Sequence, residues 1–337
     1  MRGSACVAVT SRLCWVAGSD ALQRLRDAGV EVFRPQAKGR LSGEVLVNAL
    51  CDSDAVIAST EAYTREVLFH LPRLRIIARW GVGYDAIDLD AATELGIIVT
   101  YTPKFVSEAV ADLAFGLMLS LARKIVDAAL SIRDGKWEPR LGVGVWGKTL
   151  GIVGCGRIGM AMAKRAFGFG MRVLAYDIMP SPEAQSLGVE FVSLERLLRE
   201  SDFVSLNVPL TDLTAKMIGE REIKMMKPTA FLINTSRGGV VDEEALIKAL
   251  REGWIAGAAL DVYSVEPLPQ DHPLRKMPNC ICTPHMGTHD ADAARLISEL
   301  AVECVMNALK GRVPDYVVNS AVLKRENLRI FSMPPLL

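Results

Sequence analysis

Three ionisable residues with complementary chemistry, Arg237, Glu266 and His285, occur in the second half of the chain. Each comes at or just after the end of a short apolar run that we predict to be a β-strand. Because ligands of open α/β sheets bind at the carboxyl ends of the strands, we expect these side chains to share one site. Arginine holds a carboxylate with a planar fork, and histidine exchanges a proton near neutral pH. A neighbouring carboxylate would orient the imidazole ring and favour its charged form.

This combination suits the reduction of a 2-keto acid by a nicotinamide cofactor. The reaction needs a hydride donor, a cation that polarises the carbonyl group and an acid that protonates the new alkoxide. Arg237 would supply the cation, and His285 supported by Glu266 would supply the acid. Each residue, taken alone, could also have a purely structural role. A histidine after a strand is often structural, the arginine could bridge surface acids, and the glutamate could cap the turn before Pro267.

A glycine pattern indicates where the cofactor binds. Gly154, Gly156 and Gly159 form G-x-G-x-x-G between an apolar strand segment and a helical segment, which is the context that gives this short motif its meaning. The first glycine permits a tight turn, the second lets the backbone approach a pyrophosphate, and the third lets the helix lie close to the sheet. Amide groups at the start of the helix would then face the phosphate.

Asp177 ends the next predicted strand, about 20 residues beyond the glycines, where a carboxylate accepts hydrogen bonds from the adenosine ribose. No arginine follows it within residues 178–180, so nothing nearby would neutralise the 2′-phosphate of NADP. The sequence therefore favours NAD. The alternative is a glycine-rich turn that binds no nucleotide, with Asp177 as a turn residue.

Short apolar runs alternate with helical segments along the chain, which is typical of parallel βαβ construction. We predict a first series of strands at residues 6–9, 30–33, 55–58, 75–78 and 97–99. A second series follows at residues 150–153, 172–176, 203–206, 230–233, 256–260 and 280–282. Between the two series, residues 107–133 are apolar on nearly every side, which predicts one long helix buried between two bodies.

A last helix at residues 290–310 is expected to return to the first domain. The predicted fold is therefore α/β with two doubly wound parallel-sheet domains, a Rossmann NAD-binding domain being inserted into a discontinuous flavodoxin-like substrate domain. The predicted boundaries are residues 1–102 and 288–320 for the substrate domain, 103–287 for the NAD-binding domain and 321–337 for a C-terminal tail.

Composition excludes several classes of function. The 337 residues carry 39 basic and 39 acidic side chains, so we expect no nucleic-acid partner. The longest apolar stretch, 109–121, is interrupted by Asp112 and is shorter than the roughly 20 residues that cross a membrane. Without a recognisable leader, and with seven cysteines lacking a disulfide or zinc spacing, a cytoplasmic protein without a metal is expected. Cys280 and Cys282 are interpreted as buried apolar residues, with a redox or metal role as the alternative.

Five segments of the chain resemble the D-isomer-specific 2-hydroxyacid dehydrogenases, which include phosphoglycerate, D-lactate and glyoxylate or hydroxypyruvate enzymes. The resemblance spans roughly residues 50 to 320. It rests on residues 79–88, 147–159, 234–246, 259–267 and 283–287. The resemblance implies that Arg237 binds the substrate carboxylate and keto oxygen. It also implies that Glu266 pairs with His285, and that His285 is the acid in reduction and the base in oxidation.

The same resemblance implies the remaining contacts. Backbone groups of Val82 and Gly83 would hold the substrate carboxylate. Apart from the resemblance, Arg79 and Arg140 could supply charge for a substrate phosphate or be solvated surface arginines. The catalytic cleft would lie between the domains, and a homodimer is expected. The implied cofactor-binding residues are Gly154, Gly156, Arg157, Ile158, Gly159, Asp177, Val208, Pro209, Thr235, Ser236, Asp261 and Gly287.

The specific activity stays open between phosphoglycerate dehydrogenase-like and glyoxylate or hydroxypyruvate reductase-like. Ala58 stands where some phosphoglycerate enzymes place an arginine, which weakens that assignment. Glu266 argues against formate dehydrogenases, which pair their histidine with glutamine. The alternative from another class is an NAD(H)-sensing, co-repressor-like binding protein of the same fold, because such proteins retain the three polar residues.

Overall fold

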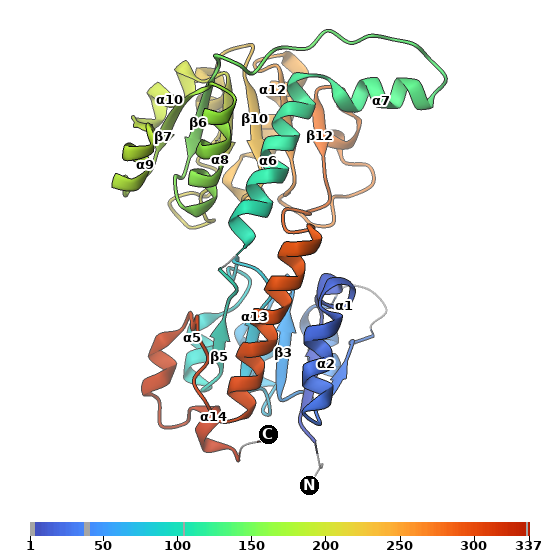
Figure 1. The fold of residues 1–337 in the computed structure, drawn as a ribbon, viewed down its shortest axis with the longest axis vertical. Helices are drawn as coiled ribbons and strands as arrows, with labels where there is room; N and C mark the ends of the chain where they lie inside the picture. The colour runs from blue at the N-terminus through green and yellow to red at the C-terminus, as the bar shows by residue number, and fades with distance from the viewer. Residues whose placement is uncertain (1–3, 37–40, 104, 335) are drawn as a thin grey trace. The chain divides into compact units, whose positions relative to one another are not determined.

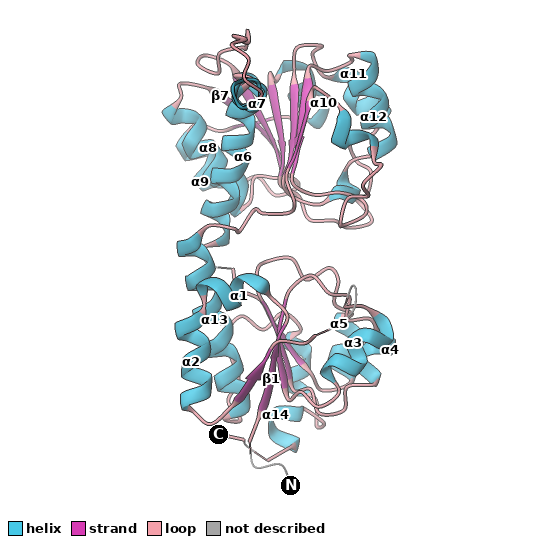
Figure 2. Ribbon diagram, turned by 90° about the vertical axis from the view of Figure 1, so that its right-hand side faces the viewer, coloured by secondary structure: helices cyan, strands magenta, loops and turns pink. Residues whose placement is uncertain are grey.

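The computed structural model describes residues 4–36, 41–103, 105–334 and 336–337. The chain forms two compact units: unit 1 comprises Met1–Val106 and Thr288–Leu337, and unit 2 comprises Ser107–Gly287. Each unit is an α/β sandwich in which helices cover both faces of a parallel sheet (Figures 1 and 2). The predicted fold class is thereby confirmed.

Unit 1 contains a five-stranded sheet of order β2-β1-β3-β4-β5. Its strands are β1 (Cys6–Val9), β2 (Glu31–Phe33), β3 (Ala55–Ala58), β4 (Ile76–Arg79) and β5 (Ile98–Thr100). Every pairing in this sheet is parallel. The order reverses between β1 and β3, as it does in flavodoxin-like sheets. These strands lie within one residue of the predicted ones.

Helices from both ends of the chain cover this sheet. One face carries α1 (Arg12–Ala17), α2 (Ser19–Asp27) and α13 (Ala291–Leu309), and the other carries α3 (Gly43–Leu50), α4 (Arg65–Phe69) and α5 (Leu89–Glu94) (Figure 2). Helix α13 packs on α1, α2, β3 and β4. It begins after Asp290, whose carboxylate accepts hydrogen bonds from the amides of Asp292 and Ala293, so this acid fixes the start of the helix.

The segment that we expected to be a C-terminal tail instead packs into unit 1 in its described part. It forms a 3₁₀ helix, η3 (Ser320–Lys324), and a short helix, α14 (Arg329–Ser332). The guanidinium of Arg329 donates hydrogen bonds to the carbonyl groups of Leu71 and Leu74 at 2.8 and 2.7 Å. Such short irregular pieces carry no hydrophobic periodicity, which is why the sequence pattern did not predict them.

Unit 2 contains a seven-stranded parallel sheet of order β12-β11-β10-β9-β6-β7-β8. Its strands are β6 (Thr149–Val153), β7 (Arg172–Tyr176), β8 (Glu190–Phe191), β9 (Phe203–Leu206), β10 (Phe231–Asn234), β11 (Gly257–Leu260) and β12 (Cys280–Cys282). The order reverses between β6 and β9, which is the Rossmann arrangement with one additional strand. Strand β8 was not predicted because two residues are too short to show a pattern.

Two hydrophobic cores fill the two faces of this sheet. One core contains side chains of α6 (Val106–Ala122), α8 (Arg157–Gly168) and α9 (Pro182–Leu187). The other contains side chains of α10 (Leu194–Glu200), α11 (Glu220–Met225) and α12 (Glu243–Glu252). The helices hold the strands from both sides (Figure 2), so the carboxyl ends of the strands are fixed relative to one another.

The single long helix predicted at residues 107–133 is wrong, because the structure has two helices there. Helix α6 ends at Ala122, and α7 (Ile125–Arg133) begins after Lys124, whose φ of +54° interrupts the helical path. The predicted burial holds for α6, where Ala114 and Met118 are fully buried. It fails for α7, where Ile132 is 54% exposed.

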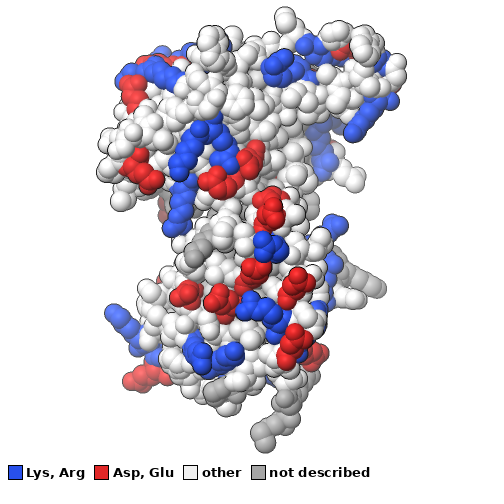
Figure 3. Space-filling model, viewed as in Figure 1, with Lys and Arg blue, Asp and Glu red and all other residues white. Residues whose placement is uncertain are grey.

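Charged side chains of both signs are interspersed on the face of the molecule drawn in Figure 3. Ion pairs also join helices: Arg165 of α8 pairs with Glu108 and Asp112 of α6 at 2.8 and 2.6 Å. Within the described part of the chain, no helix combines the length and the apolar character that a membrane crossing requires.

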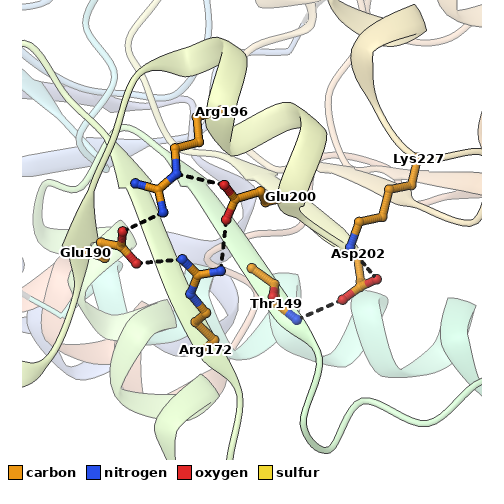
Figure 4. Close-up of polar contacts among 7 residues, drawn as sticks. All are labelled: Thr149, Arg172, Glu190, Arg196, Glu200, Asp202 and Lys227. Carbon is orange, nitrogen blue, oxygen red and sulfur yellow. Dashed lines mark hydrogen bonds and ion pairs between the residues drawn. The ribbon is translucent and has the colours of Figure 1, made fainter.

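A polar network closes the amino ends of the strands in unit 2 (Figure 4). Arg172 of β7 bonds Glu190 and Glu200, and Arg196 of α10 bonds the same two acids. Beside them, Asp202 accepts hydrogen bonds from the Thr149 amide at 2.9 Å and from Lys227 at 3.0 Å. This network lies at the edge opposite the strands' carboxyl ends, so it stabilises the sheet without touching the predicted site.

Replacing Asp202 with alanine should lower the free energy of unfolding by about 1–3 kcal/mol, because the Thr149 amide then loses its acceptor. Urea denaturation of the two proteins measures the difference. The matched control is Glu195→Ala, which removes an exposed pair with Arg199 and should change stability by about 0.5 kcal/mol or less. Equal effects of the two substitutions would contradict the role of Asp202.

Candidate active site

The glycine turn after β6 is built so that only glycine fits at two of its positions. Gly154 has a φ of +89°, and a Cβ there would lie 2.7 Å from a Val208 methyl carbon. A Cβ at Gly159 would lie 2.4 Å from the carbonyl oxygen of Gly154. At Gly156, in contrast, no described atom lies within 4 Å of the added carbon. The turn therefore packs tightly on its inner side and leaves its backbone open on the outer side.

The amino end of α8 lies at this open side and has no side-chain cap among the described residues. Gly156 is its N-cap and provides no side-chain hydrogen bond, whereas Ser193 and Asp242 cap α10 and α12 with their side chains. Helix amides without a cap, together with the helix dipole, attract an anion such as a pyrophosphate. The next residue, Arg157, is exposed, and Ile158 is half-buried; their place beside the phosphates stays a prediction.

Asp177 stands directly after β7, as predicted, and its carboxylate is engaged on both sides. One oxygen accepts the amide of Cys155 at 2.8 Å, and the other accepts the amide of Met179 at 2.9 Å. The acid thus ties the glycine turn to the neighbouring strand. Each carboxylate oxygen accepts more than one hydrogen bond, so the group remains able to accept ribose hydroxyls.

Three buried oxygens at the carboxyl ends of adjacent strands have no hydrogen-bond partner among the described residues. They are Oδ1 of Asn207 after β9, Oγ1 of Thr235 after β10 and Oδ2 of Asp261 after β11. Buried polar atoms are normally paired, so this edge fits a polar group that the protein chain does not itself supply. The nicotinamide half of NAD carries hydroxyl and carboxamide groups of the right kind.

Asn207 was not among the predicted residues, although Val208 and Pro209 beside it were. Its signal in the sequence is its place as the first residue after an apolar strand, the same place that Thr235 and Asp261 occupy after their strands. The predicted cofactor residues all lie at or just beyond the carboxyl ends of strands in unit 2, and so does this additional one.

Asp261 also holds the segment that carries His285. Its Oδ1 accepts the hydroxyl of Thr283 at 2.7 Å and the amide of Met286 at 2.8 Å. Burial raises the pKa of Asp261 above its ordinary value, although these hydrogen bonds oppose the shift. Gly287 ends the segment, and a Cβ there would lie 3.2 Å from a methyl carbon of Val110.

His285 and Glu266 form the pair that the sequence predicted. His285 Nδ1 lies 2.6 Å from Glu266 Oε2, which leaves Nε2 to exchange a proton with a ligand. The histidine adopts a φ of +50°, and non-glycine residues in this region often mark functional sites. Burial alone would raise the pKa of Glu266, but its hydrogen bond to His285 and the charges of His285 and Arg237 lower it below the ordinary value.

The loop that carries Arg237 packs directly on the loop that carries Glu266. Asn234 at the end of β10 organises the first loop, since its oxygen accepts the Ser236 amide at 3.0 Å and its amide group donates to the Arg237 carbonyl at 2.9 Å. A Cβ at Gly238 would lie 1.9 Å from the carbonyl carbon of Tyr263. Only glycine permits this approach, and it brings the guanidinium into the electrostatic environment of Glu266.

Unit 1 carries the predicted substrate loop after β4. Arg79 Nε donates to the Gly83 carbonyl at 2.6 Å, and the Gly81 amide donates to the Thr102 hydroxyl at 2.7 Å. Trp80 is buried, and its indole donates to Ser298 of α13 at 2.9 Å. Arg79 therefore folds the loop in addition to any contact with a ligand, a role that the sequence did not indicate. Val82 and Gly83 remain half-buried.

Comparisons with known proteins agree with this geometry. The family description "D-isomer specific 2-hydroxyacid dehydrogenase, NAD binding domain" matches residues 115–287. The glyoxylate reductase of Thermococcus litoralis is 49% identical over 290 residues, which is 83% of this chain and 87% of that protein. The glyoxylate reductase of Korarchaeum cryptofilum is 47% identical over 291 residues, covering 84% and 88% of the two chains.

Among solved structures, the TT0316 protein of Thermus thermophilus superposes with a TM-score of 0.84 at 42% sequence identity. The match covers 93% of this chain and 99% of that one. The similarity therefore extends over both units, not only over the nucleotide-binding one. The chain belongs to the D-isomer specific 2-hydroxyacid dehydrogenase family, and it is an NAD-dependent oxidoreductase that acts on the CH–OH group of 2-hydroxy acids.

Proposed function

We propose that this enzyme is a glyoxylate reductase, which converts glyoxylate to glycolate with NADH. The observation that carries the proposal is the Glu266–His285 pair, at 2.6 Å, beside the loop of Arg237. This arrangement supplies an acid and a carboxylate-binding cation to a small 2-keto acid. Relatives named glyoxylate reductase are 44 to 49% identical over more than four-fifths of this chain, which supports this substrate over the others of the family.

Each residue has a distinct task in the proposed reaction. NADH, held by the glycine turn of unit 2, would supply the hydride for C2 of the acid. The planar guanidinium of Arg237 holds the carboxylate and polarises the carbonyl oxygen. His285 donates the proton that the new alkoxide needs, and Glu266 holds the imidazole ring in position through its hydrogen bond to Nδ1. The resemblance to the family further implies that backbone amides of Val82 and Gly83 would bind the carboxylate.

The end of β3 argues against a phosphorylated substrate. Ala58 is fully buried there and pairs in register with Arg79 of β4. An alanine offers no donor to a phosphate group, and Arg79 is engaged with the carbonyl of Gly83. Glyoxylate, which has no side chain, needs no group at this position. These observations support glyoxylate over phosphohydroxypyruvate.

A homodimer is part of the same proposal. Apolar side chains are exposed along α7 and the loop that follows it, including Leu130 at 49%, Trp137 at 87% and Leu141 at 98%. Contiguous apolar surface of this kind commonly marks a protein–protein interface, and a second copy of the chain is the expected occupant. We also propose a cytoplasmic location, since all seven cysteines are free thiols and a reducing compartment keeps them so.

A panel of 2-keto acids tests the substrate. With NADH, glyoxylate should give the highest kcat/KM, hydroxypyruvate a lower one and phosphohydroxypyruvate the lowest, because only the last needs a phosphate site. Nicotinamide absorbance follows each reaction, and NADPH in place of NADH serves as the cofactor comparison. A preference for phosphohydroxypyruvate would refute the substrate. NADH binding without turnover of any acid would favour the co-repressor-like alternative.

The Glu266–His285 pair should control the rate. His285→Ala should lower kcat by about 10²–10⁴, the usual cost of losing a general acid. Glu266→Gln should lower kcat as well, because the amide does not fix the tautomer and orientation of the imidazole ring as the carboxylate does. The control is His70→Ala, which alters an exposed histidine at the end of α4. A wild-type kcat in Glu266→Gln would contradict the pairing.

The dimer is tested by measuring mass in solution. Light scattering after gel filtration should give about twice the chain mass of 36.7 kDa. Trp137→Ser combined with Leu141→Ser should shift the protein toward the monomer, since both side chains lose apolar contact area. Phe69→Ser, at an apolar side chain of unit 1 that is 69% exposed, is the matched control. A wild-type monomer would overturn this part of the proposal.

A further inference from the structure

Two thiols on the edge strand of unit 2 lie close enough to react with each other. Cys280 and Cys282 project from the same face of β12, and their sulfur atoms are 3.8 Å apart. Both side chains pack against the hydrophobic core next to α12 but are only partly buried, so the prediction that they are buried apolar residues holds only in part. Strand β12 is paired only with β11, so its other edge has no neighbouring strand in the described sheet.

The surroundings make one of the two sulfurs a nucleophile. The hydrogen bond from Cys280 lowers the pKa of Cys282 to about 7, and Tyr263 and Arg275 act in the same direction against burial. The same contact and burial raise the pKa of Cys280. A thiolate is the reactive form of cysteine. Near neutral pH this pair therefore presents one reactive sulfur next to a protonated one.

A metal does not account for the pair. No cluster of three or more His, Cys, Asp or Glu residues that could hold a metal ion is found among the residues that the structure describes. Two thiols alone lack the further ligands of a zinc site.

We propose that Cys280 and Cys282 form a reversible disulfide when the enzyme meets a peroxide, and that this modification slows catalysis. The Cys282 thiolate attacks one oxygen of hydrogen peroxide, the O–O bond breaks, and a sulfenic acid and a hydroxide ion form. The hydroxide takes up the proton that the thiol had released to solvent and becomes water. The sulfur of Cys280 then displaces the hydroxyl group as a second water. In total the two thiols lose two protons and two electrons, and hydrogen peroxide is reduced to two waters. A small dithiol reverses the reaction.

The disulfide cannot form without a change in the strand. Residues two apart in an extended strand have parallel side chains, so their Cβ atoms lie roughly as far apart as their Cα atoms, about 6.4–6.8 Å. The Cβ atoms of a disulfide lie about 3.5–4.5 Å apart. The two sulfurs must also approach to about 2.05 Å. Oxidation must therefore shorten or bend β12 between Cys280 and Cys282.

The segment that carries His285 begins at Thr283, the residue directly after β12. A change in the shape of β12 would therefore displace this segment. Thr283 donates its amide to Leu260 at 2.9 Å, and its carbonyl accepts the Tyr263 hydroxyl at 2.8 Å and the His285 amide at 3.1 Å. Its hydroxyl is held by Asp261. A shift at Thr283 thus changes the position of His285 relative to Glu266. This effect on catalysis rests on the proposed function, whereas the formation of the disulfide does not.

Reduced wild-type enzyme should be treated with hydrogen peroxide and analysed in parallel for covalent state and activity. Peptide mass mapping should find a Cys280–Cys282 link with the loss of two hydrogens. The kcat/KM for glyoxylate should fall by about 10²-fold, the cost of a misplacement near 1 Å. Dithiothreitol should restore both. Cys280→Ser and Cys282→Ser should keep their activity through the same treatment, and alanine replacements serve where a serine variant does not fold.

The matched control is Cys51→Ser, which removes an exposed thiol in unit 1 and should leave the inactivation unchanged. A peroxide concentration that oxidises Cys51 without linking Cys280 to Cys282 would overturn the inference. A link that forms without any change in kcat/KM would refute its effect on catalysis. If no 2-keto acid is reduced by the reduced enzyme, the proposed function fails, and the mass measurement still decides whether the disulfide exists.

Discussion

The hydrogen bond between Glu266 and His285 is the interaction around which unit 2 is arranged. The two residues come from different loops, after β11 and after β12, and each loop is fixed separately. Asp261 secures the histidine segment, and the Tyr263 amide bonds the glutamate at 3.1 Å. A carboxylate and an imidazole at 2.6 Å tolerate little displacement, so both loops depend on the parallel strands that bring them to one edge.

Backbone proximity completes the arrangement. The absence of a side chain at Gly238 lets the arginine loop rest on the backbone of Tyr263, so a cation, an acid and its partner carboxylate share one small region. The glycine turn after β6 lies at the same edge of the sheet. Gly154 and Gly159 are needed there for the same reason as Gly238, because a Cβ at either position would collide with neighbouring atoms. The charge network of Arg172 and Asp202 lies at the opposite edge. The residues that stabilise the sheet at its amino ends are therefore distinct from the residues of the site at its carboxyl ends.

Most of this architecture could be predicted from the sequence because its signals are local. Apolar runs marked the strands, and the glycine spacing with Asp177 marked the cofactor turn. What escaped prediction depends on tertiary contact: the break at Lys124, the folding of residues near Arg329 onto unit 1, and the second role of Arg79. Asn207 was missed because its sequence signal, the first place after an apolar strand, is weak by itself. The additional signal is its buried oxygen, which has no hydrogen-bond partner among the described residues.

The engagement of Asp177 has a consequence for coenzyme exchange. Because the carboxylate that would meet the ribose also accepts the Cys155 amide, coenzyme preference and the shape of the phosphate-binding turn are governed by one side chain. A substitution of Asp177 that lets the enzyme bind NADP, whether natural or engineered, would also remove the hydrogen bond to the Cys155 amide and weaken the turn. A second substitution that provides a new acceptor for that amide would have to accompany the first, so a gradual drift between the two coenzymes is obstructed at this position.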